Sequence, residues 1–338
     1  MTRKVAALPL ALPVAIVAFV SLLTLASPSD AAERSGRIVF VNQFFNDCEP
    51  ECSYKAYDYA LNTVRPDGRR GRRLGSCRRG RPCSDADPSY SPDGRRLAFE
   101  TDGGDSSGPR VMVSRADGSH RRALRLPEDP VASEPTWSPD GRQLAFVVDR
   151  DYQPSPGRIS QRSDIFIAHA DGSHLRALTN GGINRSPDWS STGLIAFTRD
   201  DPADPTSSSS DIYTVDPATG AERRLTHRGA RSPDWSPDGG RLAFSSFVGR
   251  LGHGPSNIFV LNLETRQLRR VGRMVGHDPA WSPDGRSLAY GCGGICRVSA
   301  RGGRPKLVAR PPRGGRAADG SRLISPDWQP RPVGLDRR

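Results

Sequence analysis

Lysine is nearly absent from this chain of 338 residues: only Lys4, Lys55 and Lys306 occur among its 49 basic residues. The formal net charge is nonetheless +12, because arginine is abundant. A basic balance made almost entirely of arginine is more typical of a GC-rich genome than of phosphate recognition, so we do not expect nucleic acid as a partner. A basic surface does favour anionic cell-envelope polymers or lipid headgroups, through an attraction that weakens with salt.

Helical periodicity is also missing beyond the N-terminal segment. The chain contains 35 glycines and 30 prolines, which break helices and mark turns. The roughly 300 residues that follow the N-terminal segment are enough to bury one core. The composition therefore predicts an all-β protein that is rich in turns.

The N-terminus holds the one long hydrophobic run. Two basic residues precede a nearly uncharged apolar stretch, residues 5–26, and small residues follow it. This order is typical of a secretory signal peptide, which we place at 1–31, with cleavage after Ala26 as the alternative. An uncleaved membrane anchor is a second interpretation, because the run is long enough to span a bilayer. We expect an exported protein, in the periplasm, the cell envelope or the extracellular space.

A short phrase, Pro-x-Trp or its tyrosine variant, recurs along the chain. Five copies continue into a tight turn and an apolar strand, as in Ser91-Pro-Asp-Gly-Arg-Arg-Leu-Ala-Phe99. A period in the mid-forties that carries about four short strands is the sequence signature of a β-propeller. The copies begin at Pro88, Pro135, Pro187, Pro233, Pro279 and Pro326.

The recurring residues are those that four strands and their turns require. Ser-Pro-Asp-Gly suits a type I turn, so the second strand folds straight back on the first. Leu97 and Phe99 then alternate with Ala98, which lets large side chains pack between blades while alanine permits close approach. A third strand, a second tight turn and a basic outer strand follow. We assign structural roles to Trp137, Trp189, Trp235, Trp281, Trp328, Asp93, Asp140, Asp238 and Asp284.

The first and last repeats are incomplete in complementary ways. Residues 36–40 match the second strand of a repeat and have no first strand upstream, whereas Ser325-Pro-Asp-Trp328 is a first strand with no repeat behind it. Joining the two predicts a six-bladed β-propeller over residues 36–329, with four-stranded antiparallel blades, closed by the C-terminal strand. Residues 330–338 are then a basic tail.

The full phrase, Pro-x-Trp-Ser-Pro-Asp-Gly-x-x-Leu-Ala-Phe followed by Asp-Ile-Tyr or Asp-Ile-Phe and Ala-Asp-Gly-Ser, resembles the repeat of TolB-like (WD40-like) propellers. The resemblance covers residues 36–329 and implies a six-bladed propeller fold. Full-length TolB proteins carry an additional α/β domain before their propeller, whereas Gly36 begins the first blade almost directly after the expected signal peptide. The resemblance is therefore to the propeller, without that domain.

The two faces of the predicted disc differ. Both tight turns of a repeat lie on one face because adjacent strands alternate in direction, so the variable loops lie on the other face, around the mouth of the central channel. Variable loops on a rigid scaffold commonly carry recognition, and we assign binding to this face. The carboxylates on this face have two interpretations. They could hold calcium, as channel-facing carboxylates do in six-bladed lactonases, or they are solvated loop residues, since EF-hand spacing is missing. They are Asp102, Asp105, Asp149, Asp151, Asp200, Asp201 and Asp204.

All six cysteines fall in the same set of loops. An even number of closely spaced cysteines in an exported protein indicates disulfides. A zinc site with four cysteines is the alternative, but no C-x-x-C pair occurs. The simplest connectivity joins Cys48 to Cys52, Cys77 to Cys83 and Cys292 to Cys296.

No catalytic residue emerges from the sequence. Residues 104–108 satisfy G-x-S-x-G, but a nucleophile elbow requires a helix after the serine, and none is predicted there. We therefore predict a monomeric, non-enzymatic propeller without a cofactor, which binds a protein, peptide or cell-envelope polymer through its variable-loop face. The alternative is a cation-dependent propeller enzyme of the lactonase or sugar-dehydrogenase type, since a propeller fold alone implies no function.

Overall fold

The computed structural model describes residues 36–46, 56–74, 84–102, 108–150, 162–200, 210–227, 229–247, 256–272, 275–310 and 322–330. Every regular element in these ranges is a β-strand, so the predicted all-β class is confirmed. None of these segments forms a helix that could span a bilayer. The expected signal peptide, 1–31, and residues 331–338 of the expected basic tail lie outside the described ranges.

The strands form sets of four, which we call units, and neighbouring strands within a unit pair antiparallel. In unit 1, β24 (Arg322–Trp328) pairs with β1 (Ile38–Asn46), which is followed by β2 (Ala56–Val64) and β3 (Arg72–Arg73). Units 2 and 3 follow in sequence. Unit 2 comprises β4 (Asp85–Tyr90), β5 (Arg96–Thr101), β6 (Arg110–Arg115) and β7 (Arg122–Ala123), and unit 3 comprises β8 (Ala132–Trp137), β9 (Gln143–Asp149), β10 (Ser163–His169) and β11 (Arg176–Ala177).

Units 4 to 6 are built in the same order. Unit 4 comprises β12 (Ile183–Trp189), β13 (Ile195–Asp200), β14 (Asp211–Val215) and β15 (Glu222–Arg224), and unit 5 comprises β16 (Ala230–Trp235), β17 (Arg241–Phe247), β18 (Ser256–Asn262) and β19 (Leu268–Val271). Unit 6 comprises β20 (His277–Trp281), β21 (Ser287–Gly291), β22 (Ile295–Ser299) and β23 (Lys306–Ala309).

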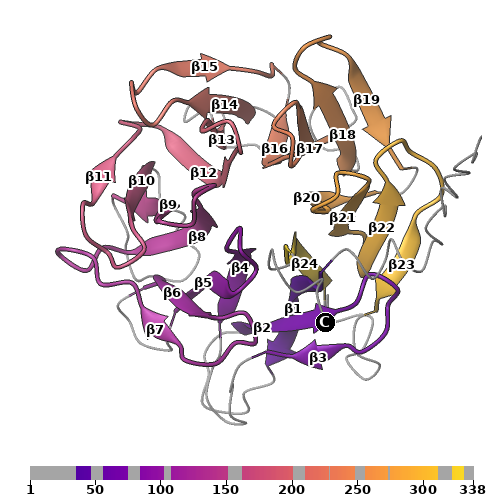
Figure 1. Cartoon of the computed structure of the whole chain (residues 1–338), viewed down its shortest axis with the longest axis horizontal. Coiled ribbons are helices and arrows are strands. Elements are labelled where there is room, and N and C mark those ends of the chain that lie inside the picture. The colour runs from indigo at the N-terminus through magenta and orange to yellow at the C-terminus, as the bar shows by residue number, and fades with distance from the viewer. Residues whose placement is uncertain are drawn as a thin grey trace, which may run out of the picture.

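The units surround a common centre (Figure 1). In each unit the first strand lies innermost and the fourth lies at the outer edge. A single parallel pair, Ser163 with Ile183, joins units 3 and 4 into one eight-stranded sheet. The innermost strands β4, β8, β12, β16, β20 and β24 thus bring the repeated Pro-x-Trp or Pro-x-Tyr phrase to the centre of the molecule.

An apolar cluster fills the space between neighbouring units. Leu97 and Phe99 on β5 are fully buried and pack with Val41 of unit 1. Ala98 points to the other face of β5 and packs with Trp137 of unit 3. Full burial of a leucine or phenylalanine side chain contributes about 1.5–3 kcal/mol, so the alternating Leu-Ala-Phe strand holds two junctions together.

Units 6 and 1 are joined in the same way. Trp328 on β24 is buried in a cluster with Ile38 of unit 1 and with Ala280 and Ile295 of unit 6. The indole Nε1 of Trp328 donates a hydrogen bond to the backbone oxygen of Ala280 (3.0 Å). Contacts between the two ends of the chain therefore resemble those between units that are consecutive in sequence.

The tight turns have the hydrogen bonds expected from Ser-Pro-Asp-Gly. The backbone N–H of Gly141 donates to the carbonyl of Ser138 (2.8 Å), and the Ser138 hydroxyl donates to Asp140 Oδ1 (2.6 Å). These contacts, with the N–H of Arg142, hold the pKa of Asp140 below its ordinary value. The backbone N–H of Ala170, in the second turn, donates to Arg142 (2.8 Å), so both turns of the unit lie side by side.

Candidate functional site

The innermost strands share a break in their pairing at the residue before the repeated proline. The register with the second strand shifts at this point in each unit, as in a β-bulge. The residue before the proline has a positive φ of 43–51°. Proline suits the bulge because it has no N–H to leave unpaired. The residues with positive φ are Asp87, Glu134, Ser186, Ser232, Asp278 and Ser325.

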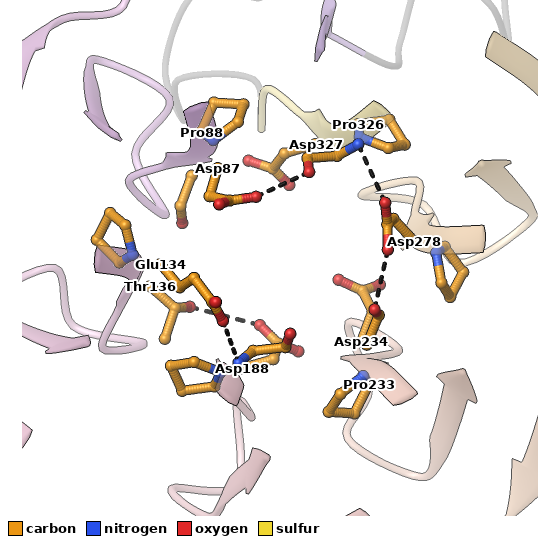
Figure 2. Close-up of a pocket in the computed structure, with 17 residues that line it drawn as sticks. Asp87, Pro88, Glu134, Thr136, Asp188, Pro233, Asp234, Asp278, Pro326 and Asp327 are labelled. Atoms are coloured by element: carbon orange, nitrogen blue, oxygen red, sulfur yellow. Dashed lines mark hydrogen bonds between the residues drawn. The ribbon is translucent and has the colours of Figure 1, made fainter. Parts of the chain in front are cut away.

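The bulges surround a central cavity of about 140 Å³. Its lining consists mainly of the residue before each proline, the proline and the residue after it. Figure 2 shows the acidic side chains directed toward the middle of this ring. None of the described residues that line the cavity is a lysine or an arginine. The carboxyl groups of the lining belong to Asp87, Glu134, Asp188, Asp234, Asp278 and Asp327.

Three of these carboxylates connect neighbouring units. Each is the middle residue of a Pro-x-Trp phrase, and each accepts a hydrogen bond from the backbone N–H of the aromatic residue in the next unit. Such bonds to a charged acceptor are roughly twice as strong as neutral ones. They therefore set the spacing of the innermost strands. The pairs are Asp188 with Trp235 (2.6 Å), Asp234 with Trp281 (2.6 Å) and Asp327 with Tyr90 (2.7 Å).

Burial raises the pKa of all three connecting carboxyls. Desolvation raises the pKa of Asp188 to about 6 and that of Asp327 to about 7, against the hydrogen bonds that each accepts. Desolvation also raises the pKa of Asp234 well above its ordinary value, and repulsion from Asp188 adds to this. The ring is therefore partly protonated near neutral pH.

A second group of carboxyls lies where units 2 and 3 meet. Glu100, on β5, accepts a hydrogen bond from the backbone N–H of Glu134 (3.2 Å). Burial, followed by repulsion from Asp87 and Glu134, raises the pKa of Glu100 well above its ordinary value. Burial and repulsion from Glu134 raise the pKa of Asp87 to about 7, although the Ser325 hydroxyl donates to Asp87 (2.8 Å). Burial also raises the pKa of Glu134, and the charge of Arg185 opposes this.

On the opposite side of the cavity, Asp278 lies beside His277. Asp278 accepts a hydrogen bond from the Ser232 hydroxyl (2.9 Å) and lies 3.0 Å from His277 Nδ1. Burial favours the neutral carboxyl, but the contacts with His277, Ser232 and the backbone of Ser325 together outweigh it and lower the pKa of Asp278. A Cβ at Gly291 would lie 2.2 Å from the His277 ring, so a larger residue there would have to displace this ring. The ionised form is thus favoured at Asp278 and disfavoured at the carboxyls where units 2 and 3 meet.

Two of the carboxylates predicted in the variable loops lie near this acidic side. Asp149 is the last residue of β9, and Asp102 directly follows β5. The charge of Asp102 contributes to the raised pKa of Glu100, after burial, Asp87 and Glu134. The charge of Asp149 likewise acts on Glu134, whose pKa burial raises most. Both residues therefore extend the negative field of the cavity.

Asp200, a third predicted carboxylate, is held in ion pairs. Arg231 lies 3.2 Å from one of its carboxylate oxygens and Arg185 lies 3.7 Å from the other. The Ser210 hydroxyl donates to Asp200 as well (2.5 Å). Its charge is thus compensated within the protein. The other predicted carboxylates, Asp105, Asp151, Asp201 and Asp204, lie outside the described residues.

The predicted Cys292–Cys296 disulfide is present, with the two Cα atoms 5.9 Å apart, and it joins the end of β21 to the start of β22.

Across the described part of the chain, no three His, Cys, Asp or Glu side chains are grouped so that they could hold a metal ion. Calcium binding therefore stays a prediction. Outside the described residues lie Cys48, Cys52, Cys77, Cys83 and residues 103–107, which contain the serine of the G-x-S-x-G segment.

Sequence reasoning placed binding in the variable loops and assigned the Pro-x-Trp phrase to the scaffold, so it missed the carboxyls of the cavity. A signal was present at the position before the proline, where the six copies carry only Asp, Glu or Ser. A second signal was the aspartate in the middle of Pro-Asp-Trp, which occurs in three copies.

Solved structures of similar shape include TolB proteins. TolB from Acinetobacter baumannii has a TM-score of 0.65 and 19% identity, over 88% of this chain and 67% of that chain. A putative TolB from Agrobacterium tumefaciens has a TM-score of 0.59 and 17% identity, over 86% of this chain and 98% of that chain. A nidogen/laminin complex has a TM-score of 0.62 and 10% identity, over 87% of this chain and 98% of that chain.

At these identities the likeness to solved structures shows the fold alone. No curated protein sequence matches the chain. The family model PD40, described as the TolB beta propeller domain, matches residues 35–248, which is more than half of the chain. The chain therefore belongs to the TolB beta propeller domain family.

Proposed function

We propose that this protein is an exported, non-enzymatic six-bladed β-propeller that binds a protein or peptide partner, and that the partner places a cationic group in the central cavity. The six blades are units 1 to 6, and β24 closes the ring. Support for closure comes from the pairing of β24 with β1 and from the apolar cluster between units 6 and 1. Support for export comes from the apolar run at residues 5–26.

The observation that carries this proposal is the concentration of carboxyls where units 2 and 3 meet. Burial and mutual repulsion disfavour the ionised forms of Asp87, Glu100 and Glu134. An amine or guanidinium placed among them would favour ionisation and would donate charge-assisted hydrogen bonds to their oxygens. Binding of a cation is thus the change that relieves this side of the cavity most directly.

The size of the cavity points to a side-chain head or a terminal amine rather than to a large ligand. Its volume of about 140 Å³ is below the roughly 300–1,000 Å³ of pockets that enclose drug-sized molecules. The rest of the partner would lie on the variable-loop face. Asp102 directly follows β5 and Asp149 is the last residue of β9, so both lie at the ends of second strands that lead to that face.

The test is the affinity of a fluorescent short peptide with one lysine, compared with the same peptide carrying acetyl-lysine. We expect the lysine peptide to bind and the acetylated peptide to bind at least about tenfold more weakly, because the latter offers no charge. Asp87→Asn with Glu134→Gln should weaken binding of the lysine peptide by a similar factor.

A matched control removes two carboxylates from the tight-turn face. Asp117→Asn with Asp171→Asn changes the net charge equally, and both residues are exposed in the second tight turns of units 2 and 3. This control should bind the lysine peptide as the parent does. Equal weakening in both double variants, or equal affinity for the two peptides, would contradict the proposal. So would calcium retained by the purified protein and lost on removing these cavity carboxylates, since that outcome favours a cation-dependent enzyme.

A further inference from the structure

The outer edge of unit 1 carries a dense group of arginines that the central cavity does not use. Arg69, Arg70, Arg72 and Arg73 are four of five consecutive residues in the turn after β2 and in β3, and all four are exposed. Arg65, at the start of this turn, is half-buried. Figure 1 shows β3 at the rim of the molecule, away from the innermost strands.

Arg37 adds a further positive charge to this group. Its Nε donates to the Thr63 hydroxyl (3.2 Å), and its guanidinium also donates to the backbone oxygen of Arg70. Burial lowers the pKa of Arg37, and the charge of Arg72 lowers it further, followed by those of Arg65 and Arg70. The guanidiniums are therefore close enough for their charges to act together. We call Arg37, Arg65, Arg69, Arg70 and Arg72 the arginine patch.

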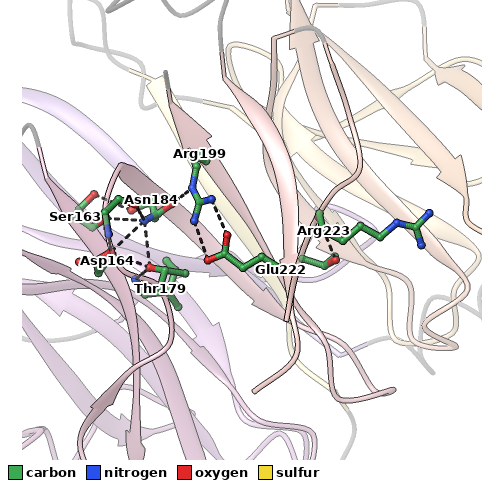
Figure 3. Close-up of polar contacts among 10 residues, drawn as sticks. Ser163, Asp164, Thr179, Asn184, Arg199, Glu222 and Arg223 are labelled. Carbon is green, nitrogen blue, oxygen red and sulfur yellow. Dashed lines mark hydrogen bonds and ion pairs between the residues drawn. The ribbon is translucent and has the colours of Figure 1, made fainter. Parts of the chain in front are cut away.

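The described carboxylates close to the patch, Asp67 and Asp117, form no ion pair with it. Within the described residues, none of its five guanidiniums forms an ion pair, and Asp67 accepts the backbone N–H of Arg69 (2.8 Å). Several arginines elsewhere on the molecule form ion pairs with carboxylates. Arg199 donates to both carboxylate oxygens of Glu222, at 2.7 and 3.0 Å (Figure 3). The patch thus leaves several arginines available to an anionic partner on one surface.

We propose that the arginine patch binds a linear polymer that carries phosphate groups. Guanidinium pairs with phosphate oxygens in a bidentate geometry and keeps its charge at any physiological pH. The arginines lie along an exposed turn and an edge strand, so a chain of repeated anions can meet several of them at once, whereas a single anion meets one or two. This surface is separate from the central cavity, and its partner has the opposite charge.

The test is binding of inorganic polyphosphate to the full protein over a range of salt concentrations. The variant Arg69→Gln, Arg70→Gln, Arg72→Gln removes three exposed charges of the patch. We expect its dissociation constant to rise at least about tenfold, and the slope of log K against log salt to fall by about two, since each lost phosphate contact changes it by roughly 0.7.

The control variant Arg122→Gln, Arg223→Gln, Arg266→Gln removes the same charge from exposed positions on units 2, 4 and 5. Arg266 also has a positive φ (57°), as Arg70 does (53°), so the control matches the backbone conformation. It should bind polyphosphate as the parent does. Circular dichroism and thermal melting of both triple variants show whether each is folded.

Equal weakening by the two triple variants would overturn the proposal, because it would assign binding to net charge. Failure of the parent to bind polyphosphate would also overturn it, as would binding of the parent to vesicles of phosphatidylglycerol but not to the soluble polymer. Affinity for the lysine peptide should be unchanged in the patch variant. The inference about the patch and the function proposed for the cavity therefore fail independently.

Discussion

Replacing Asp327 with asparagine should stabilise the protein at and above neutral pH. Asp327 accepts the backbone N–H of Tyr90 (2.7 Å) in the bond that joins unit 1 to unit 2. The amide oxygen of asparagine can accept the same bond without carrying a charge. Because burial raises the pKa of Asp327 from 3.8 to about 7, it is the ionised carboxylate that the fold disfavours.

The size and sign of this effect follow from the two pKa values. Between pH 3.8 and about 7 the native state binds more protons at Asp327 than the unfolded state does. The contribution of this group to stability is therefore complete below pH 3.8 and is lost as the pH rises to about 7. The difference between these two pKa values corresponds to a free energy of unfolding of about 4 kcal/mol. The side chain is partly exposed, so we expect solvent screening to reduce the effect to ~2 kcal/mol.

The assay is the free energy of unfolding by denaturant titration, measured for parent and variant near pH 4 and near pH 8. Asp327→Asn should match the parent at the lower pH and exceed it by ~2 kcal/mol at the higher pH. Asp327→Ala leaves the N–H of Tyr90 without an acceptor and should lose ~1–3 kcal/mol at the lower pH. A difference between Asp327→Asn and the parent that does not change with pH would refute the reasoning.

Two further predictions concern stability. The Trp328 indole donates to Ala280 (3.0 Å), whereas the buried Trp281 indole N–H has no partner among the described residues, so Trp328→Phe should cost about 1 kcal/mol more than Trp281→Phe. Denaturant midpoints compare the two, and equal losses would argue against a role for the indole bond. Cys292→Ser with Cys296→Ser should lose ~2 kcal/mol, because the disulfide closes a short loop in the unfolded chain. A melting temperature unchanged by this substitution would contradict that estimate.

The four-strand repeat could be predicted from sequence because its determinants are local. In the turn between β8 and β9, the bonds that fix the chain join Ser138 to Asp140, to Gly141 and to Gln143, at most five residues apart. The alternation of Leu97, Ala98 and Phe99 likewise assigns the two faces of one strand without knowledge of any other. Such interactions act between residues close in the chain, so they can be recognised from the sequence alone.

The roles of the loop carboxylates could not be predicted in this way. Asp102, Asp149 and Asp200 occur at similar places, just after or at the end of a second strand. Asp200 is paired with Arg231, 31 residues away, whereas the charge of Asp102 acts on Glu100 and that of Asp149 acts on Glu134. The sequence around each aspartate does not show which charges the fold will bring near it.

The sequence by itself determined the all-β class, the strands and tight turns of the repeat and the Cys292–Cys296 disulfide, because each depends on contacts between residues close in the chain. Only the tertiary structure decided that the residues before and after the repeated prolines line one acidic cavity. Those residues are 46 to 52 positions apart from one copy to the next. Their charges meet only because a bulge in each innermost strand turns one side chain toward the common centre. Charge repulsion and desolvation arise there from proximity in space, which no single repeat encodes.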